Sequence, residues 1–478
     1  MSGPGEGSRW TALYVLCAGM LMIVLDVTVV NVALPSIQSD LGFSDASLAW
    51  VVNAYLIAFG GLLLLAGRAG DLLGRRRVFL AGVSLFSCAS LACGLAQSEW
   101  LLVAARFVQG AGGAMTSAVI LGMIVTMFPQ PREQAKAIGV YAFVASAGGS
   151  VGLLAGGAIA QSLGWHWIFF VNVPIGVATV ALSRRLLDPD SGIGLERGAD
   201  VLGAALVTAA LMLAVYTIVG PAAEAGWGAP RTLALGGGCM LLLVAFAVRE
   251  ARASDPLVPP RILRSRGLVA ANAVQALSVP AMFGMFFLGA LYLRRVQHYD
   301  ALHIGLAFLP VTVAMGGLSI GFSERLVMRF GARATMLPGL ALIAAGVSVL
   351  ALATVHSGYL TGVMPAMLLL GLGAGACFPA LMTLAMSGTA ASDAGLASGV
   401  LNTTAQVGGA LGLAVLATIA SSRTRHLLAS GHTSAASLTA GYQLAFWIAA
   451  ALAVVAIAVA LTVPGRSRAA AAAAAARA

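Results

Sequence analysis

The chain has 478 residues, of which 60% are hydrophobic and only 9% are charged, and its formal net charge is +10. A soluble globular domain carries about 25% charged residues, so this composition excludes a protein with an ordinary water-facing surface. The positive charge does not indicate nucleic-acid binding, because the arginines lie in short segments between apolar blocks.

Apolar blocks of roughly 20 residues, the length that crosses a bilayer as a helix, recur along the whole chain. Short separators with proline, glycine or charge divide them, which predicts an all-α polytopic membrane protein of about 14 spans. The first block is too long for a signal-peptide core, so we expect it to be retained. The predicted spans are 11–35, 46–66, 78–96, 100–127, 135–160, 166–186, 200–219, 232–250, 267–293, 304–323, 335–354, 360–387, 395–420 and 440–463.

Basic residues are distributed unevenly between the two sides that alternating spans define. With the N-terminus in the cytoplasm, the inner segments hold 21 of the 27 lysines and arginines, the outer segments hold five, and Arg106 lies within a span. Because cytoplasmic loops carry the basic excess, we expect a protein of the cytoplasmic membrane with both termini inside.

A weak internal repeat relates the two halves of the chain. The loops at 67–77 and 324–333 both place a glycine just before a basic turn that opens the next span. Two similar bundles with a separate middle piece explain this repeat. We therefore predict an N-terminal six-helix bundle at 1–186, a two-helix insertion with cytoplasmic flanks at 187–266, a C-terminal six-helix bundle at 267–463, and a disordered or frayed cytoplasmic tail at 464–478.

Asp26 lies deep inside the first span, nine residues before its predicted outer end at Pro35. An ionisable group at this depth is costly and is a functional-site hypothesis by default. Arg106 lies six residues inside the fourth span, counted from the same side, so at about 1.5 Å per residue the two charges have comparable depth. They can form a permanent structural ion pair, or Asp26 can titrate and change its relation to Arg106 or to a substrate.

Neutral polar and adaptable side chains in several spans are candidates for a substrate site. Gln109 follows Arg106 by one helical turn and can orient it, and amides share faces of the ninth and thirteenth spans. Buried amides either bind a substrate or tie helices together, and methionine and aromatic stripes either line a cavity or pack. The candidates are Asn31, Tyr55, Gln109, Asn272, Gln275, Met282, Phe286, Asn402 and Gln406.

Signals for other chemistry are weak. The sequence has no phosphate loop ending in Gly-Lys-Ser or Gly-Lys-Thr. Its six histidines are scattered, and its five cysteines lie in apolar segments without metal-ligand spacing. We therefore expect no enzyme activity, no cofactor and no metal.

Several motifs are distributed over almost the whole chain. They are Leu25–Pro35 in the first span, Gly67–Arg77 in the loop after the second, Arg106, Gln109 and Gly110 in the fourth, Gly148–Gly157 in the fifth, and Gly395–Gly409 in the thirteenth. Together they resemble the signatures of the fourteen-span drug:proton antiporter family of the major facilitator superfamily. One departure is Leu153, which stands where the fifth-span signature of that family normally has a proline.

The resemblance implies the major facilitator fold, with two six-helix bundles plus two extra transmembrane helices. It also implies a monomeric proton-coupled antiporter that exports hydrophobic or cationic small molecules by alternating access, with Arg106 tied to proton coupling. A facilitator or importer of one dedicated metabolite on the same fold, and a non-transporting membrane receptor, are the alternatives.

Two of the motifs are candidates for a conformational gate. Charge pairs in the loop motif can latch the bundles in one state, although positive-inside anchoring also explains the arginines. The fifth-span glycines either pack closely or provide a sliding seam. The candidate gate residues are Gly67, Asp71, Gly74, Arg75, Arg76, Gly148, Gly152, Gly156 and Gly157.

Overall fold

The computed structural model describes residues 6–44, 47–188, 190, 192, 200–222, 225–253, 256–258, 265–386 and 394–462. Within these ranges the chain forms helices joined by short turns, and thirteen helical segments are long and apolar enough to cross a membrane. The helix at Pro131–Ser162 matches the remaining predicted span. Each of the fourteen predicted spans thus has a helical counterpart, and the all-α polytopic prediction is confirmed.

The N-terminal helices pack around α1, α3 and α4. In this group α1 contacts α5 and α7, while α3 contacts α4 and α7 and α2 contacts α4. The sixth predicted span is interrupted at Val171, which divides it into two helices. The group comprises α1 (Glu6–Leu41), α2 (Trp50–Leu73), α3 (Arg75–Gly94), α4 (Glu99–Met127), α5 (Pro131–Ser162), α6 (His166–Phe170) and α7 (Asn172–Leu186).

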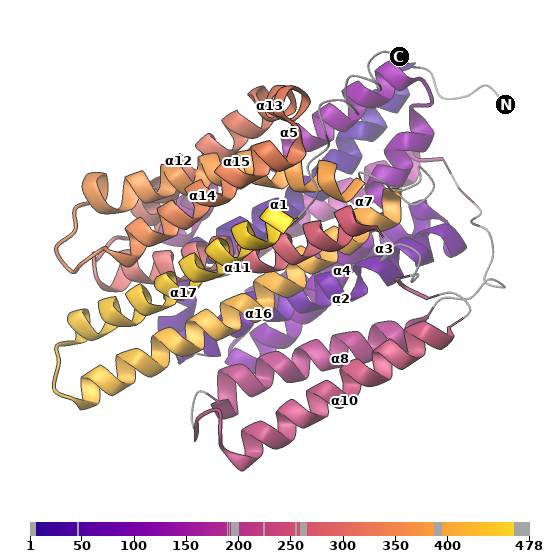
Figure 1. Ribbon diagram of the computed structural model, residues 1–478. Helices are drawn as coiled ribbons and strands as arrows, with labels where there is room; N and C mark the ends of the chain where they lie inside the picture. The colour runs from indigo at the N-terminus through magenta and orange to yellow at the C-terminus, as the bar shows by residue number, and fades with distance from the viewer. Residues whose placement is uncertain are drawn as a thin grey trace.

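Two further long helices lie along one flank of the molecule (Figure 1). They are α8 (Val201–Thr217), which continues into the π-helical turn η3 (Ile218–Ala222), and α10 (Pro230–Arg252). α8 contacts both α2 and α16 (Ala394–Ala429), and α10 packs against α8 on the outside. Their ends are joined by the ion pair between Asp200 and Arg249, with an N–O distance of 3.0 Å.

The C-terminal helices form a second group. In it α14 contacts α15 and α17, and α11 contacts α16 and α17. The group comprises α11 (Arg266–Arg295), α12 (Ala301–Gly321), α13 (Ser323–Phe330), α14 (Ala332–Ala351), η5 (Tyr359–Val363), α15 (Met364–Met386), α16 and α17 (Ser434–Thr462).

The two groups meet mainly along three helix pairs, α5 with α12, α2 with α16, and α1 with α11. The α5–α12 crossing is so close that a Cβ on Gly305 would lie 2.5 Å from the carbonyl oxygen of Leu153. Hydrogen bonds from Arg295 to Gln38, and from Gln161 to Asp300 at 3.3 Å, join the groups at the same end.

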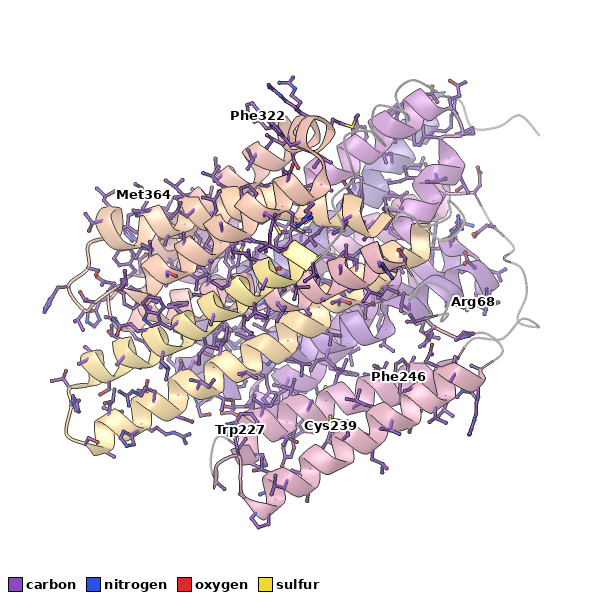
Figure 2. The ribbon with its side chains drawn as sticks, viewed as in Figure 1. Arg68, Trp227, Cys239, Phe246, Phe322 and Met364 are labelled. Atoms are coloured by element: carbon purple, nitrogen blue, oxygen red, sulfur yellow. The ribbon has the colours of Figure 1, made fainter. Side chains whose placement is uncertain are left out.

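That shared end lies opposite the loop motif. Arg68 at the end of α2 is on one side of the molecule, whereas Trp227 and Met364 lie on the other (Figure 2). Asp300 lies in the turn before α12, where the backbone N–H and imidazole of His303 hold the pKa of its carboxyl group below the usual value. In the predicted orientation this end faces outside the cell.

The internal repeat in the sequence corresponds to two similar corners in the structure. Gly74 joins α2 to α3 with φ of +99°, and Gly331 joins α13 to α14 with φ of +88°. Residues other than glycine rarely adopt positive φ, which explains a glycine at both corners. One expectation was wrong: residues 324–330 belong to the helix α13 rather than to a loop, because apolar and basic residues alternate there with helical spacing.

The predicted division of the chain at 186 and 266 falls after α7 and at the start of α11. The organisation into separate moving bundles remains a prediction. The predicted tail at 464–478 lies outside the described residues.

Candidate functional site

Asp26 of α1 and Arg106 of α4 form an ion pair inside the N-terminal helices. Nη1 of Arg106 lies 2.5 Å from Oδ2 of Asp26, and each residue is only 1% exposed. Nε of Arg106 donates to the backbone carbonyl of Val51 on α2 at 2.9 Å. The structure therefore contains the pairing that the depth argument indicated, and a third helix fixes the guanidinium.

Two amides hold the second carboxylate oxygen. Oδ1 of Asp26 accepts from Nε2 of Gln109 at 2.7 Å and from Nδ2 of Asn172 at 3.2 Å. Both amides also donate to the hydroxyl of Ser90, at 2.6 and 3.4 Å. Gln109 in turn accepts from Nη1 of Arg106 at 2.6 Å, as its one-turn spacing predicted. These five residues, Asp26, Ser90, Arg106, Gln109 and Asn172, are termed the buried polar cluster below.

Aromatic rings cover the guanidinium of this cluster. The Cζ atom of Arg106 lies 4.4 Å from the ring centroid of Tyr55 and 5.8 Å from that of Phe169. A cation over an aromatic face is stabilised by the ring quadrupole, more strongly when water is excluded. Tyr55, a candidate for substrate binding, is thus part of the wall of the ion-pair site, and its hydroxyl has no hydrogen-bond partner among the described residues.

The contacts around Asp26 depend on whether its carboxyl group is charged. Burying an ion pair is costly, and the cost is offset only by good geometry and by hydrogen bonds to the remaining lone pairs. The ionised carboxylate receives donors from Arg106, Gln109 and Asn172. Adding a proton would remove the charge that these donors stabilise, so side chains on α1, α4 and α7 respond to one protonation event.

Sequence reasoning missed Asn172 and Ser90, although a signal for both was present. Asn172 lies six residues inside the predicted span 166–186, and Ser90 lies six residues before the end of the predicted span 78–96. Arg106 lies six residues inside its own span from the same side. Applying the depth count to neutral polar residues would have placed all three in one layer.

The polar candidates of α11 and α16 lie apart from this cluster. Nδ2 of Asn272 donates to its own helix at Leu268, while its Oδ1 accepts from Thr404 at 2.5 Å, which ties α11 to α16. Oε1 of Gln275, one turn further, has no partner among the described residues. Asn402 is exposed.

The remaining substrate candidates have packing contacts. The Cβ atom of Gln406 would lie 2.8 Å from a Cβ on Gly60, so it sits at the α2–α16 crossing. The Phe286 ring lies 5.4 Å from that of Phe308, and Met282 is buried. Asn31 donates to Val27 of its own helix. Substrate binding by these residues remains a prediction.

The loop motif is built around Arg75. Nη1 of Arg75 donates to the carbonyl of Gly122 on α4 at 2.9 Å, and Nη2 lies 3.2 Å from Asp71. Asp190, which sequence reasoning missed, accepts from the backbone N–H groups of Arg75 and Arg76 at 2.5 and 3.1 Å and so caps α3. A Cβ on Gly74 would collide with Asp190 at 2.6 Å.

These contacts stay within the N-terminal helices and the segment that follows α7. Arg76 donates to the carbonyl of Arg184 at 2.6 Å. A Cβ on Gly67 would meet only Ala118, at 4.0 Å, so this position is loosely packed. The role of the loop motif as a latch between the bundles remains a prediction.

The fifth-span glycines serve two different interfaces. Cβ atoms on Gly148, Gly152 and Gly156 would collide with α1 at 2.9, 2.0 and 2.8 Å, whereas one on Gly157 would lie 2.7 Å from the Ala301 carbonyl of α12. α5 is one uninterrupted helix across Leu153, the position at which the family that this chain resembles normally has a proline. The glycines therefore let α5 approach both groups of helices closely.

Comparison with known proteins agrees with this architecture. The family model described as Major Facilitator Superfamily matches residues 16–413. A bacterial homologue of the human lysosomal transporter Spinster, solved in an inward-facing and unoccupied conformation, superposes with a TM-score of 0.67 at 19% identity, covering 96% of this chain and 97% of that one. A variant of the nucleoside transporter NupG gives 0.66 at 11% identity, covering 95% and 99%. These likenesses show the fold.

Relatives of higher identity cover most of the chain. The puromycin resistance protein pur8 of Streptomyces alboniger is 40% identical over 457 residues, which are 95% of this chain and 90% of the relative. The cephamycin export protein CmcT of Amycolatopsis lactamdurans is 39% identical over 417 residues, or 87% and 85%. The chain therefore belongs to the Major Facilitator Superfamily, a family of membrane transporters, as its motifs predicted.

Proposed function

We propose that this protein is a proton-coupled antiporter that exports hydrophobic or cationic small molecules across the cytoplasmic membrane by alternating access. The observation that carries the proposal is the ion pair of Asp26 and Arg106, buried among membrane-spanning helices. Ionisable groups at this depth commonly mark proton relays in pumps and transporters.

Protonation of Asp26 supplies the coupling step. In the ionised state the carboxylate compensates the charge of Arg106 and draws α1, α4 and α7 together. In the protonated state Arg106 loses its counter-charge in a site that excludes water, so its attraction to α1 falls. The N-terminal helices then change their packing against the C-terminal helices at the α1–α11, α2–α16 and α5–α12 contacts, which exchanges the side that is open.

The direction follows from the proposed orientation. With both termini in the cytoplasm, the buried polar cluster lies in the outer half of the membrane, within reach of protons from outside. Movement of a proton down its gradient into the cell, by way of Asp26, then drives one conformational cycle that carries a substrate outward.

The class of substrate rests on the relatives and on the polar candidates of α11 and α16. The relatives are named for resistance to puromycin, export of cephamycin and resistance to lincomycin. These three compounds are chemically diverse organic molecules. The Oε1 atom of Gln275, which no described residue engages, and the exposed amide of Asn402 can accept and donate hydrogen bonds beside apolar residues. We propose that a substrate of this kind binds between the two groups of helices and that the protein acts as a monomer.

Transport into and out of proteoliposomes tests the proposal. Purified protein would be reconstituted with a pH gradient, and movement of puromycin or a cationic dye would be followed for the wild type, Asp26→Asn and the matched control Asp40→Asn. Asp40 is an exposed carboxylate at the end of the same helix. We expect gradient-driven transport in the wild type and the control, and a loss of at least tenfold in Asp26→Asn. Equal gradient-driven transport by all three proteins would reject proton coupling through Asp26, and transport independent of the gradient would favour a facilitator.

A further inference from the structure

One buried acceptor beside Asp26 has no donor in the part of the chain that the structure describes. Asn172 is fully buried, and its Nδ2 donates to Oδ1 of Asp26 and to the hydroxyl of Ser90. Its own Oδ1 has no hydrogen-bond partner among the described residues. A buried acceptor without a donor costs about 1–3 kcal/mol, so its presence beside a titratable group requires an explanation.

Protonation of Asp26 creates the donor that this acceptor lacks. The ionised carboxylate only accepts hydrogen bonds, whereas the protonated form carries an O–H that must donate. Oδ2 is held by Arg106 and can remain an acceptor, so the new proton belongs on Oδ1. Two amides reach that oxygen, those of Gln109 and Asn172.

Gln109 cannot present its oxygen to a protonated Asp26. Its Oε1 already accepts from Nη1 of Arg106 at 2.6 Å, and its Nε2 donates to both Asp26 and Ser90. Turning this amide over would place its N–H₂ group against the guanidinium and lose those bonds. Asn172 has no such constraint, because nothing described holds its oxygen.

The position of Asn172 also permits the movement. It is the first residue of α7, directly after the interruption at Val171. The terminal torsion of asparagine is broad and roughly two-fold, so a half turn of the amide exchanges donor and acceptor within nearly the same volume. The charged and titratable groups that act on Asp26 come from other helices, Arg106 from α4, Tyr55 from α2 and Cys93 from α3.

We propose that Asn172 is a positioning residue that serves both protonation states of Asp26, donating to the carboxylate through Nδ2 and, after a half turn, accepting from the protonated carboxyl through Oδ1. The inference rests on the proposed proton coupling. A proton from the outer aqueous phase forms an O–H bond with a lone pair of Asp26 Oδ1, no bond breaks, and the charge of the Asp26–Arg106 pair rises from zero to +1. Because Asn172 belongs to α7, the turn of its amide couples the protonation state of Asp26 to that helix.

Infrared difference spectroscopy on the whole protein tests the proposal. The chain has five asparagines, so labelling them with ¹³C at the side-chain carbonyl gives a sparse spectrum. As pH falls, we expect a protonated carboxyl band, absent from Asp26→Asn, and a simultaneous shift of one labelled asparagine carbonyl to lower frequency as it gains a hydrogen bond. A carboxyl band that titrates while every asparagine carbonyl stays unchanged would overturn the proposal.

Substitution of Asn172 provides an independent test of the proposal. Asn172→Leu keeps the branched shape and the number of side-chain heavy atoms. It leaves the Asp26 O–H without an acceptor and takes one donor from the ionised carboxylate, which retains Arg106 and Gln109. We expect the carboxyl band to move to higher frequency, because the O–H loses its acceptor. The midpoint should change less, because the variant removes one hydrogen bond from each protonation state of Asp26. Asn172→Ser, whose hydroxyl both donates and accepts, should recover part of the frequency shift and serves if the leucine variant does not fold.

One control variant and two different outcomes distinguish the role of Asn172 from the proposed proton coupling. Thr179→Val alters another buried residue of α7 whose hydroxyl bonds only its own helix at Ile175, and it should leave band and midpoint unchanged. An unchanged carboxyl frequency in Asn172→Leu would show that Asn172 merely packs. Absence of any titrating carboxyl band in the wild type would instead reject the proposed coupling itself.

Discussion

The interiors of the two groups of helices differ in the kind of polar residue that they bury. The N-terminal helices enclose the ion pair of Asp26 and Arg106 with the amides of Gln109 and Asn172. Among the described residues of α11–α17, the buried polar side chains are serines and threonines. Hydroxyls such as those of Thr335 and Thr439 bond the carbonyl four residues earlier along the chain.

This difference indicates how the two interiors are held together. A hydroxyl satisfied within its own helix leaves that helix free to pack through apolar contact alone. The buried polar cluster instead needs side chains from four helices at once, and a carbonyl from a fifth. We infer that the N-terminal helices respond to charge, whereas the C-terminal helices respond to shape and to neutral ligands.

The largest expected effect comes from removing one charge of the N-terminal interior. Arg106→Leu leaves the buried carboxylate of Asp26 without its partner, which costs about 3–5 kcal/mol in comparable buried pairs. We expect a strongly lowered Tm of the purified protein in detergent, together with lost transport. The double variant Asp26→Asn/Arg106→Leu should recover most of the Tm but none of the gradient-driven transport. If Arg106→Leu were as stable as the double variant, the fold would not depend on Arg106 to compensate the charge of Asp26.

A smaller loss is expected where helices approach closely. A Cβ at Gly110 would lie 2.3 Å from the backbone carbonyl of Tyr55, so Gly110→Ala must separate α2 from α4 beside the cluster. Overpacking of this kind costs about 1–3 kcal/mol. The matched control is Gly317→Ala on α12, where a Cβ would meet nothing within 4 Å and helix propensity should improve. Equal Tm changes in the two variants would contradict the close packing described here.

The neutral interior of the C-terminal helices should affect binding without affecting coupling. Gln275→Leu removes a buried acceptor that the described protein groups leave free. If a substrate uses it, apparent affinity should fall about fivefold, corresponding to the roughly 1 kcal/mol of one net hydrogen bond. The number of protons moved per substrate, measured in proteoliposomes, should stay constant. A changed proton ratio would remove the distinction between the two interiors.

The smallest effect is expected at the corner between α2 and α3, where the loop motif lies. Asp71 and Arg75 form an i, i+4 pair with both side chains partly exposed. Exposed pairs of this kind contribute about 0.2–1 kcal/mol or less. Asp71→Ala should therefore barely change Tm, while Asp190→Ala, which uncaps α3, should cost about 0.5–2 kcal/mol. A large loss of transport in Asp71→Ala with an unchanged Tm would support the predicted latch.

The sequence predicted the spans and the ion pair because both produce strong local signals. Apolar blocks of membrane length are separated by charge, and Asp26 and Arg106 are ionisable residues within such blocks. Asn172 and Ser90 give no such signal, because neutral polar residues occur in many spans and their importance depends on which helices become neighbours. Asp190 was missed for a similar reason, since its partners at α3 lie 114 and 115 residues away along the chain.

The candidates for substrate binding show where sequence reasoning stops. Tyr55 and Gln109 were grouped with a substrate site, yet their contacts belong to the ion pair. Gln406 lies at a helix crossing, whereas Asn402, on the same helix face by sequence, is exposed. Whether a polar side chain faces a cavity or a neighbour depends on packing angles that periodicity within one helix does not contain.

The most direct test of the account is the movement of protons during substrate export. A pH-sensitive dye inside proteoliposomes would follow protons while puromycin or a cationic dye moves down an imposed concentration gradient. We predict that protons cross in the opposite direction in the wild type, and that this proton flux vanishes in Asp26→Asn while downhill substrate movement persists. Substrate movement without counter-moving protons in the wild type, or an undiminished proton flux in Asp26→Asn, would contradict it.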